Sequence, residues 1–451
     1  MEPSPFNITE HVVDCQHIRE YARATRSTND ALKLAVKQYT PKSNPNPQPG
    51  DVTIIGATSV GSPKELNEPL WEEVYERLER QGLRIRSIWI TDSAHQAASA
   101  AINAEHLGFE RTFCTCYQQN LPKINRILAS WFDHSRDLLY MINKFKAEMP
   151  KPIIGVGHSI GVGQLLGLSL IHPRLFTSLI LIEPVIVKDF DSGRGSSFAK
   201  SALIKKDTWK SRSEADAYFR KALQGWDSRC LDLWFKYGLR DLDFQADSAG
   251  TGNHESAVGL ATTKDQEIAQ SLRPNFVDLQ PANIDSNKHS DYLRDPTFYI
   301  DVTGQSKTLP FYRYEPILLW RLLKYVRPSV LWIYGGKSIM ATPDQRAEKL
   351  QRTGTGVGGS GGYKNGRVKE IVIPEGGHFV PFEDVAGVAE PASEWIRHEI
   401  ARWKEEEDRI QKGWLELTAK ERSSIPNEWL AQMDKYFMKG KAGKTKVRAK
   451  L

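Results

Sequence analysis

The stretch from residue 152 to residue 186 constrains the fold of this chain more than any other. PIIGVG (152–157) is an apolar run of strand length, GVGQLLGLSLIH (161–172) has the length and composition of a helix, and TSLILIEPVI (177–186) is a second strongly apolar run. A strand, a tight turn, a helix and a second strand in this order indicate two parallel strands joined by a crossover helix.

The same alternation continues on both sides of this stretch. Short runs rich in β-branched and aromatic residues predict further strands over 51–57, 84–90, 329–336 and 368–374. Apolar residues at helical spacing predict helices over 70–82, 135–149, 343–352 and 384–403. We therefore expect an α/β fold with a mostly parallel sheet and helices on both faces.

The alternation stops between residues 188 and 325, where helical pieces and polar loops follow one another. We interpret this region as an inserted, mainly helical lid. The expected organisation has four parts: a first part of the core over 1–187, the lid over 188–325, a second part of the core over 326–434, and a basic, flexible tail over 435–451.

Composition narrows the function classes. The chain has 451 residues, 40% of them apolar, which is enough for a large core. Its four cysteines (Cys15, Cys114, Cys116 and Cys230) form no CxxC pair, so we expect neither a metal site nor a disulfide framework. No apolar run reaches the length of a membrane span and the N-terminus lacks the order of a signal peptide, so we expect an intracellular, soluble protein.

The net charge of +6 does not indicate a nucleic-acid partner, because the stretch 434–451 alone carries seven Lys or Arg residues. That stretch ends in Ala449-Lys450-Leu451, a close variant of the Ser-Lys-Leu signal that the peroxisomal import receptor reads. We therefore expect the peroxisomal matrix as the location and the import receptor as a partner. The sequence leaves the oligomeric state open, a homodimer included.

The turn after the first apolar run carries the candidate chemistry. Gly157-His158-Ser159-Ile160-Gly161 matches the Gly-x-Ser-x-Gly pattern of a nucleophile elbow, in which a serine sits between a strand and a helix. A serine hydroxyl is unreactive at neutral pH, so Ser159 as a nucleophile needs a histidine to accept its proton and an acid to orient that histidine.

His378 is the best candidate for the base, because it follows the last expected strand and precedes the final helix. The acid is less obvious, since no carboxylate lies near Ser338, where one is expected, and Asp344 lies too far along the chain. Glu183 ends the apolar strand after the elbow helix, where a buried charge needs a partner. The alternative is a salt bridge from Glu183 to the lid, with Asp189 or Asp191 as the acid.

Backbone NH groups are needed to hold the oxyanion that forms during acyl transfer. The NH of Ile160, at the start of the elbow helix, is one expected donor. The second is expected in the loop TSVGSPKE (58–65), with Ser62 first and Val60 and Gly61 behind it. We expect Val60 and Gly61 to contact the substrate as well. The alternative for this loop is an ordinary turn in which Pro63 starts a helix.

These residues resemble those of the fungal peroxisomal α/β-hydrolases of secondary metabolism, a group that includes the host-selective toxin biosynthesis hydrolases and the acyl-CoA hydrolases of mycophenolic acid biosynthesis. The resemblance extends over nearly the whole chain. It is carried by FNITEHVV, PKELNEPLWEEV, WFDHSRDLLYMINKF, GHSIGVGQ, HPRLFTSLILIEPVI, GGHFVPFED, LTAKERSSIPNEWL and the terminal AKL. It implies an α/β-hydrolase fold, a type I acyl-CoA thioesterase activity, and an acid at the position of Glu183.

The chain departs from these relatives at Thr58-Ser59-Val60-Gly61-Ser62, where they carry a His-Ala-Asn-Gly-Phe or His-Gly-Thr-Gly-Phe run. The lost histidine and aromatic residue bear on the shape of the acyl pocket. We therefore keep three hypotheses: a serine hydrolase of acyl-CoA thioesters, a carboxylesterase or lactonase acting on oxygen esters, and a catalytically weak binding or scaffold protein of the pathway. The two enzyme hypotheses require no cofactor.

The expected lid offers two sets of side chains suited to an acyl-CoA. Trp209 and Trp226, with three further aromatic residues, are expected to line an apolar acyl cavity. Seven cations could meet the phosphates of CoA: Lys200, Lys205, Lys206, Lys210, Arg212, Arg220 and Lys221. The alternatives are an ordinary lid core and a solvated helix face.

Overall fold

The computed structural model describes residues 4–21, 24–27, 29–107, 129–189, 194–242, 256–274, 311–340 and 342–441. The chain divides into two compact units, residues 1–399 and residues 400–451. The larger unit contains all the candidate site residues. Across the described ranges, no helix combines the length and the apolar character needed to cross a membrane.

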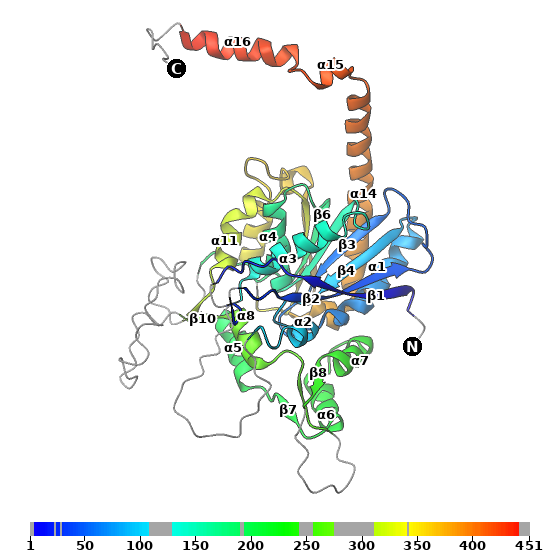
Figure 1. The fold of residues 1–451 in the computed structure, drawn as a ribbon, viewed down its shortest axis with the longest axis vertical. Coiled ribbons are helices and arrows are strands. Elements are labelled where there is room, and N and C mark those ends of the chain that lie inside the picture. Colours follow the sequence, from blue (N-terminus) through cyan, green and yellow to red (C-terminus); the bar gives the residue numbers. More distant parts are fainter. Residues whose placement is uncertain are drawn as a thin grey trace, which may run out of the picture. The chain divides into compact units, whose positions relative to one another are not determined.

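An eight-stranded sheet forms the centre of the larger unit (Figure 1), with the strand order β1-β2-β4-β3-β5-β6-β12-β13. Its strands are β1 (Phe6–Asp14), β2 (Lys33–Pro41), β3 (Val52–Ala57), β4 (Ile85–Thr91), β5 (Ile153–His158), β6 (Ser178–Ile182), β12 (Ser329–Gly335) and β13 (Val368–Ile373). From β4 to β13 every pairing is parallel. The expected mostly parallel α/β fold is confirmed.

The four central strands β3, β5, β6 and β12 are buried along their whole length. Strands that are covered on both faces must be apolar throughout, which is why they were the easiest to recognise in the sequence. Strands β1 and β2 were not predicted. They pair antiparallel at the edge of the sheet, and most of β1 is exposed, so its sequence lacks a continuous apolar run.

Helices flank the sheet at the places that the sequence indicates. The main ones are α1 (Glu68–Arg80), α2 (Ala97–Ile102), α3 (Trp131–Lys144), α4 (Ile160–Ile171), α11 (Glu315–Leu322), α12 (Pro343–Arg352), α13 (Val380–Glu383) and α14 (Val385–Leu415). Helix α4 is almost entirely buried, because it packs between the sheet, α3 and α11. This position explains why its sequence is apolar all round.

The region expected as a lid contains helices, but it also contains short strands. Its helices are α5 (Arg194–Ile204), α6 (Arg212–Ala222), α7 (Ser228–Tyr237) and α8 (Lys264–Ser271). A small antiparallel sheet joins β7 (Thr208–Trp209), β9 (Val258–Leu260) and β8 (Leu239–Asp241), and β10 (Arg273–Pro274) pairs with β11 (Phe311–Tyr312). Figure 1 shows these elements, mostly green, gathered on one side of the central sheet.

The structure divides the end of the chain at other residues than those expected from the sequence. The core was expected to reach residue 434, but the larger unit ends at Glu399. Residues 435–441, expected in a flexible tail, belong to helix α16 (Asn427–Lys441), which follows the short helix α15 (Ala419–Arg422). Residues 408–437 are exposed throughout. This segment is therefore helical but does not belong to the buried core. The terminal Ala449-Lys450-Leu451 lies outside the described residues.

Candidate active site

Ser159 occupies a sharp turn between β5 and α4. Its backbone has φ 56° and ψ −114°, a conformation that side-chain-bearing residues rarely adopt. Its NH donates to the Ile182 carbonyl at 3.0 Å. The flanking glycines are required by close packing, since a Cβ at Gly161 would lie 2.2 Å from the Ala57 carbonyl oxygen and one at Gly157 would lie 2.8 Å from that of Gly161. The turn has the geometry that the sequence motif predicts.

Three predicted side chains form one hydrogen-bonded chain. Ser159 Oγ donates to Nε2 of His378 at 3.0 Å, and Nδ1 of His378 donates to Oε2 of Glu183 at 3.0 Å. The imidazole lies on the loop between β13 and α13, and the carboxylate follows β6 directly. Glu183 is only 1% exposed and Ser159 is 5% exposed, so the chain runs from a buried acid to the surface of a cavity.

The Glu183 carboxylate receives three hydrogen bonds from the protein. Besides His378, the Gly335 NH donates to Oε1 at 2.7 Å, and Ser338 Oγ donates to Oε2 at 2.5 Å. These donors replace the hydration that burial removes. The structure thus explains why no carboxylate is found near Ser338: a hydroxyl occupies that place and donates to the acid from β6. Sequence reasoning identified Glu183 but missed Ser338 and Gly335.

The alternative acids do not take this place. Asp189 is exposed, and Asp344 lies in the first turn of α12, also exposed. Asp191 lies outside the described residues.

Glu183 has a left-handed backbone, with φ 50°, and its NH donates to the Ile333 carbonyl at 2.8 Å. Local strain of this kind costs energy and is held only where surrounding contacts over-determine it.

The side chain of His158 packs against His378 and binds its backbone. It is 1% exposed, and its Nε2 donates to the His378 carbonyl at 2.8 Å. Its ring also lies 5.4 Å, centroid to centroid, from the rings of His378 and Phe382. Burial, together with the neighbouring His378 imidazole, lowers the pKa of His158 to about 3. His158 is therefore neutral at physiological pH and acts as a fixed hydrogen-bond donor under the candidate base.

The loop over residues 58–62 lies beside Ser159. The Gly61 NH donates to Oε1 of Gln96 at 3.0 Å, and the Ser62 NH lies 3.4 Å from the Ser59 carbonyl oxygen. The hydroxyl of Ser59 donates to that of Ser62 at 2.7 Å. Within the described part of the chain, the NH groups of Val60 and Ile160 have no protein hydrogen-bond partner.

A buried ion pair fixes the end of this loop. Lys64 donates to Asp92 with its backbone NH and with Nζ, both at 2.9 Å, and Nζ also lies 2.9 Å from Oε1 of Glu65. Burial raises the pKa of Asp92 to about 6 against the opposing charge of Lys64. Because both partners are buried and the contacts are bidentate, the loop is held in one position.

A cavity of about 580 Å³ is lined by Ser159 and His378, while Glu183 lies buried behind them. Ser159, Ile160 and His378 line it together with all of Ser59–Ser62 and with residues from the region expected as a lid. Its apolar wall includes Val185, Val187, Phe198, Phe219, Trp226, Trp234, Ile317, Met340 and Phe379. The prediction that Val60, Gly61 and Trp226 lie at the substrate cavity agrees with this arrangement.

Trp209 does not line the cavity, contrary to the prediction. It is 2% exposed and packs behind the wall, with its ring 5.1 Å from that of Phe219 and 5.4 Å from that of Tyr218. Its place in the small strand β7 directs it into the lid core. Of the seven lid cations, Lys205 and Lys206 line the cavity. Arg212 and Arg220 instead pair with Asp241 and Asp216 near the lid surface.

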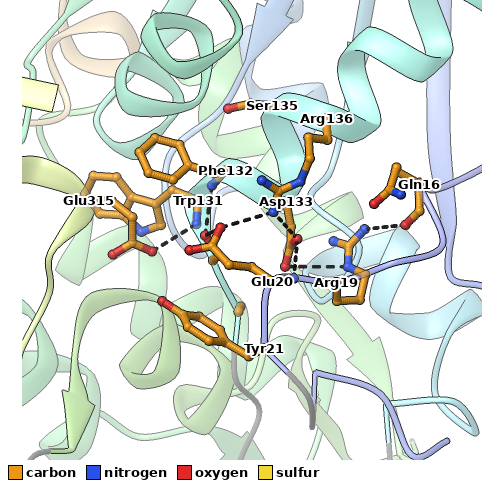
Figure 2. Close-up of polar contacts among 12 residues, drawn as sticks. Gln16, Arg19, Glu20, Tyr21, Trp131, Phe132, Asp133, Ser135, Arg136 and Glu315 are labelled. Atoms are coloured by element: carbon orange, nitrogen blue, oxygen red, sulfur yellow. Dashed lines mark hydrogen bonds and ion pairs between the residues drawn. The ribbon is translucent and has the colours of Figure 1, made fainter. Parts of the chain in front are cut away.

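A network of buried charges holds another part of the cavity wall (Figure 2). Arg19 binds Asp137 at 2.7 Å, and Arg136 binds both Asp133, at 2.6 Å, and Glu20. The carboxylate of Glu315 accepts from the NH of Trp131 at 3.2 Å. These contacts join the segment 16–21 to the start of α3 and fix Trp131, which lines the cavity.

Arg313 completes this support. Its guanidinium donates to the carbonyls of Ala129, Ala269 and Gln270 at 2.9–3.0 Å and to Glu315 at 3.2 Å. It thereby ties the end of α8 to the beginnings of α3 and α11. Sequence reasoning missed this network because its members lie far apart along the chain.

No cluster of three metal-ligating side chains occurs among the residues that the structure describes. Cys15 and Cys230 are free and buried, and Cys114 and Cys116 lie outside the described residues.

The fold of the chain is similar to that of solved hydrolase structures. No protein-family model matches the chain. The fold resembles the peroxisomal alpha-beta-hydrolase Lpx1 from Saccharomyces cerevisiae, with a TM-score of 0.60 and 17% identity over 98% of this chain and 100% of the other. It also resembles E-2-(acetamidomethylene)succinate hydrolase, with a TM-score of 0.52 and 12% identity over 87% of this chain and 100% of the other. The larger unit has an α/β-hydrolase fold.

Sequence comparison gives the family. The type I acyl-CoA thioesterase mpaH of Penicillium roqueforti is 37% identical over 90% of this chain and 91% of its own length. The mpaH' protein of Penicillium brevicompactum is 36% identical over 92% of this chain and 96% of its own length. An abhydrolase domain-containing protein of Alternaria alternata, ACTT2-2, is 26% identical over 62% of this chain and 97% of its own length. The chain belongs to the mpaH family of type I acyl-CoA thioesterases, and it is a hydrolase.

The buried His158 predicts a specific pH dependence of stability. The unfolded chain takes up a proton at the ordinary histidine pKa of 6.5, whereas folded His158 resists protonation down to about pH 3. The free energy of unfolding should therefore fall as the pH drops below 6.5. Between pH 6.5 and pH 4 the contribution of this one residue is about 3 kcal/mol.

The variant His158→Gln keeps an NH donor for the His378 carbonyl but cannot take up a proton. In urea unfolding at a series of pH values, its loss of stability between pH 6.5 and pH 4 should be smaller than that of the wild type by this amount. His172→Gln, at an exposed position, serves as the control and should follow the wild type. Equal losses in all three proteins would contradict the assignment of His158 as a buried neutral donor.

Proposed function

We propose that this hydrolase cleaves an acyl-CoA thioester to a free acid and CoA, with Ser159 as the nucleophile, His378 as the base and Glu183 as the acid that orients it. The observation that carries the proposal is the hydrogen-bonded chain of these residues beneath the cavity. The names of the Penicillium relatives support the thioester as substrate. The resemblance of the sequence to hydrolases of fungal secondary metabolism supports a role in secondary-metabolite or toxin biosynthesis.

In the first step Ser159 Oγ attacks the thioester carbonyl carbon while its proton passes to Nε2 of His378. The carboxylate of Glu183 accepts the hydrogen bond from Nδ1 and stabilises the imidazolium that forms. The negative charge develops on the former carbonyl oxygen. We assign this oxyanion to the NH groups of Ile160 and Val60, because both lack protein partners and both residues line the cavity.

This assignment replaces Ser62 as the preferred second donor. The Ser62 NH already faces the Ser59 carbonyl within its own turn, and the Gly61 NH is bound by Gln96. Val60 lies between the anchored ends of the loop. The macrodipole of helix α4, whose N-terminus begins at Ile160, adds to the stabilisation of the oxyanion.

In the second step the tetrahedral intermediate collapses, the C–S bond breaks and CoA leaves as a thiol with the proton from His378. A thiol pKa near ~8.5 makes sulfur a good leaving group, so this machinery suffices. Water then attacks the acyl-Ser159 ester, with His378 taking its proton and returning it to Oγ. The products are the free acid and the regenerated serine.

Release of free CoA thiol from a panel of acyl-CoAs tests the proposal. Ser159→Ala should abolish turnover. Glu183→Gln should lower kcat by about 10³- to 10⁴-fold, because a neutral amide cannot hold the imidazole in the required tautomer. Ser169→Ala is the matched control, since Ser169 is a buried serine on α4 that donates to the Leu166 carbonyl and does not line the cavity.

Two outcomes would contradict the proposal. Faster turnover of a matched oxygen ester than of the thioester would assign the site to a carboxylesterase or lactonase. No turnover on either ester, with Ser159 also unreactive toward a fluorophosphonate probe, would favour the binding or scaffold role.

We also propose that the protein is imported into the peroxisomal matrix through Ala449-Lys450-Leu451. The support is the sequence of this tripeptide and the basic stretch before it. A fluorescent protein placed at the N-terminus should co-localise with a peroxisomal marker, and removal of the three residues should leave it in the cytosol. Peroxisomal import that survives the removal would contradict the proposal.

A further inference from the structure

A charged pair lies in the wall of the largely apolar cavity. Lys205, which directly follows α5, contacts Oε1 of Glu267 on α8 through its ammonium group. Both residues line the same cavity as Ser159 and His378. The side chains are only 27% and 13% exposed. A pair so placed loses hydration, and a salt bridge of this kind is weak evidence for stability.

The pair lies against the loop that carries the proposed oxyanion donor. A Cβ at Gly61 would lie 2.7 Å from Oε1 of Glu267, and the backbone of Gly61 has φ +73°. Glycine is favoured here by its conformation, and its missing side chain leaves room for the carboxylate. The carboxylate therefore lies against Gly61, the residue that follows the proposed oxyanion donor Val60.

The remaining hydrogen-bonding capacity of the pair defines the ligand. No described residue other than Glu267 binds the ammonium group of Lys205, and none binds Oε2 of Glu267. The site thus offers a donor and an acceptor side by side. A hydroxyl group, which donates one hydrogen bond and accepts others, satisfies both. A carboxylate on the substrate would be repelled by Glu267, and an ammonium group would be repelled by Lys205. A methylene chain would offer no hydrogen bond to either charge.

The geometry of the reaction places this hydroxyl on the acyl chain. His378 passes its proton to the leaving group, so the CoA sulfur lies beside His378. That imidazole is flanked by Phe198, at 4.9 Å between ring centroids, and Phe379, at 5.4 Å. The charged pair lies instead at the loop 58–62, which carries the proposed oxyanion donor Val60. The part of the substrate that reaches the pair is therefore the acyl group.

We propose that Lys205 and Glu267 bind a hydroxyl group on the acyl chain, so that the enzyme selects hydroxyacyl thioesters over their deoxy counterparts. The inference rests on the proposed function, since it assumes that acyl esters are cleaved in this cavity. A site built around a half-buried polar pair discriminates against an analogue that lacks the matching group, because the pair then receives no hydrogen bond from the substrate.

Matched pairs of acyl-CoAs, identical except for a hydroxyl at successive carbons of the chain, test the inference. For at least one position the wild type should show kcat/KM about 10- to 100-fold higher for the hydroxyacyl-CoA than for its deoxy partner. In the double variant Lys205→Met, Glu267→Met this preference should vanish, through a loss on the hydroxyacyl-CoA alone. Both side chains are half-buried, and replacing them together leaves no charge unpaired, so the variant remains folded and measurable.

The matched control is the double variant Lys264→Met, Asp207→Met. Lys264 lies on the same helix as Glu267 and pairs with Asp207 at 3.3 Å, but neither residue lines the cavity. It should retain the hydroxyl preference of the wild type. Equal losses on both members of each acyl-CoA pair in the Lys205→Met, Glu267→Met protein, or no loss on either, would overturn the inference.

p-Nitrophenyl esters of the same acids separate this inference from the proposed function. A hydroxyl preference on these esters without thioester turnover would support the inference and refute the thioesterase proposal. Thioester turnover without any hydroxyl preference would refute the inference alone. A loss in the variant confined to CoA esters, whatever the acyl group, would assign the pair to the pantetheine arm and likewise overturn it.

Discussion

The buried carboxylate of Glu183 at the end of β6 is the interaction on which the rest of the site depends. Strand β6 lies between β5, which ends at the Ser159 turn, and β12, which ends at Gly335. The ladder continues past both strand ends, since Ser159 NH donates to the Ile182 carbonyl and Glu183 NH to that of Ile333. One acid can therefore bind His378, Gly335 and Ser338 at once, and its partners fix the position of the imidazole relative to the serine.

The other half of the site is built from segments that are distant in sequence. The loop 58–62 is held by Gln96 on one side and by the ion pair of Lys64 and Asp92 on the other. The lid reaches the same place, since the Ala97 NH donates to Thr262 at 3.0 Å. One connected support is therefore formed by the loop 58–62, the start of α2 at Ala97 and the lid. Two hydrogen bonds thus join Thr262 to Ala97 and the neighbouring Gln96 to Gly61, beside Ser159.

The sequence was most informative where a single local constraint acts. The central strands were recognisable because burial on both faces requires an apolar run, and Ser159 because the elbow requires glycines on either side. Glu183 was found because a charge that ends so apolar a strand requires a partner. The class of protein and its relatives followed from motifs spread over nearly the whole chain.

The sequence was least informative where long-range packing decides. Trp209 was expected at the cavity as one of the aromatic residues of the lid, whereas the small strand β7 buries it behind Phe219. The Ser62 NH faces the Ser59 carbonyl within its own turn, and the Gly61 NH is bound by Gln96, a residue 35 positions away, so that Val60 is left as the proposed second oxyanion donor. The same is true of Ser338, whose role becomes visible only when β6 and β12 lie side by side.

Covalent catalysis by Ser159 is the central claim, and the acyl-enzyme intermediate tests it most directly. The enzyme would be mixed with an acyl-CoA that it hydrolyses and quenched in acid at times shorter than one turnover. The protein would then be digested and its peptides analysed by mass spectrometry. We predict that the acyl mass appears on the peptide containing Ser159 and decays as the free acid forms. CoA release without any acyl adduct, or an adduct on a different residue, would contradict the account.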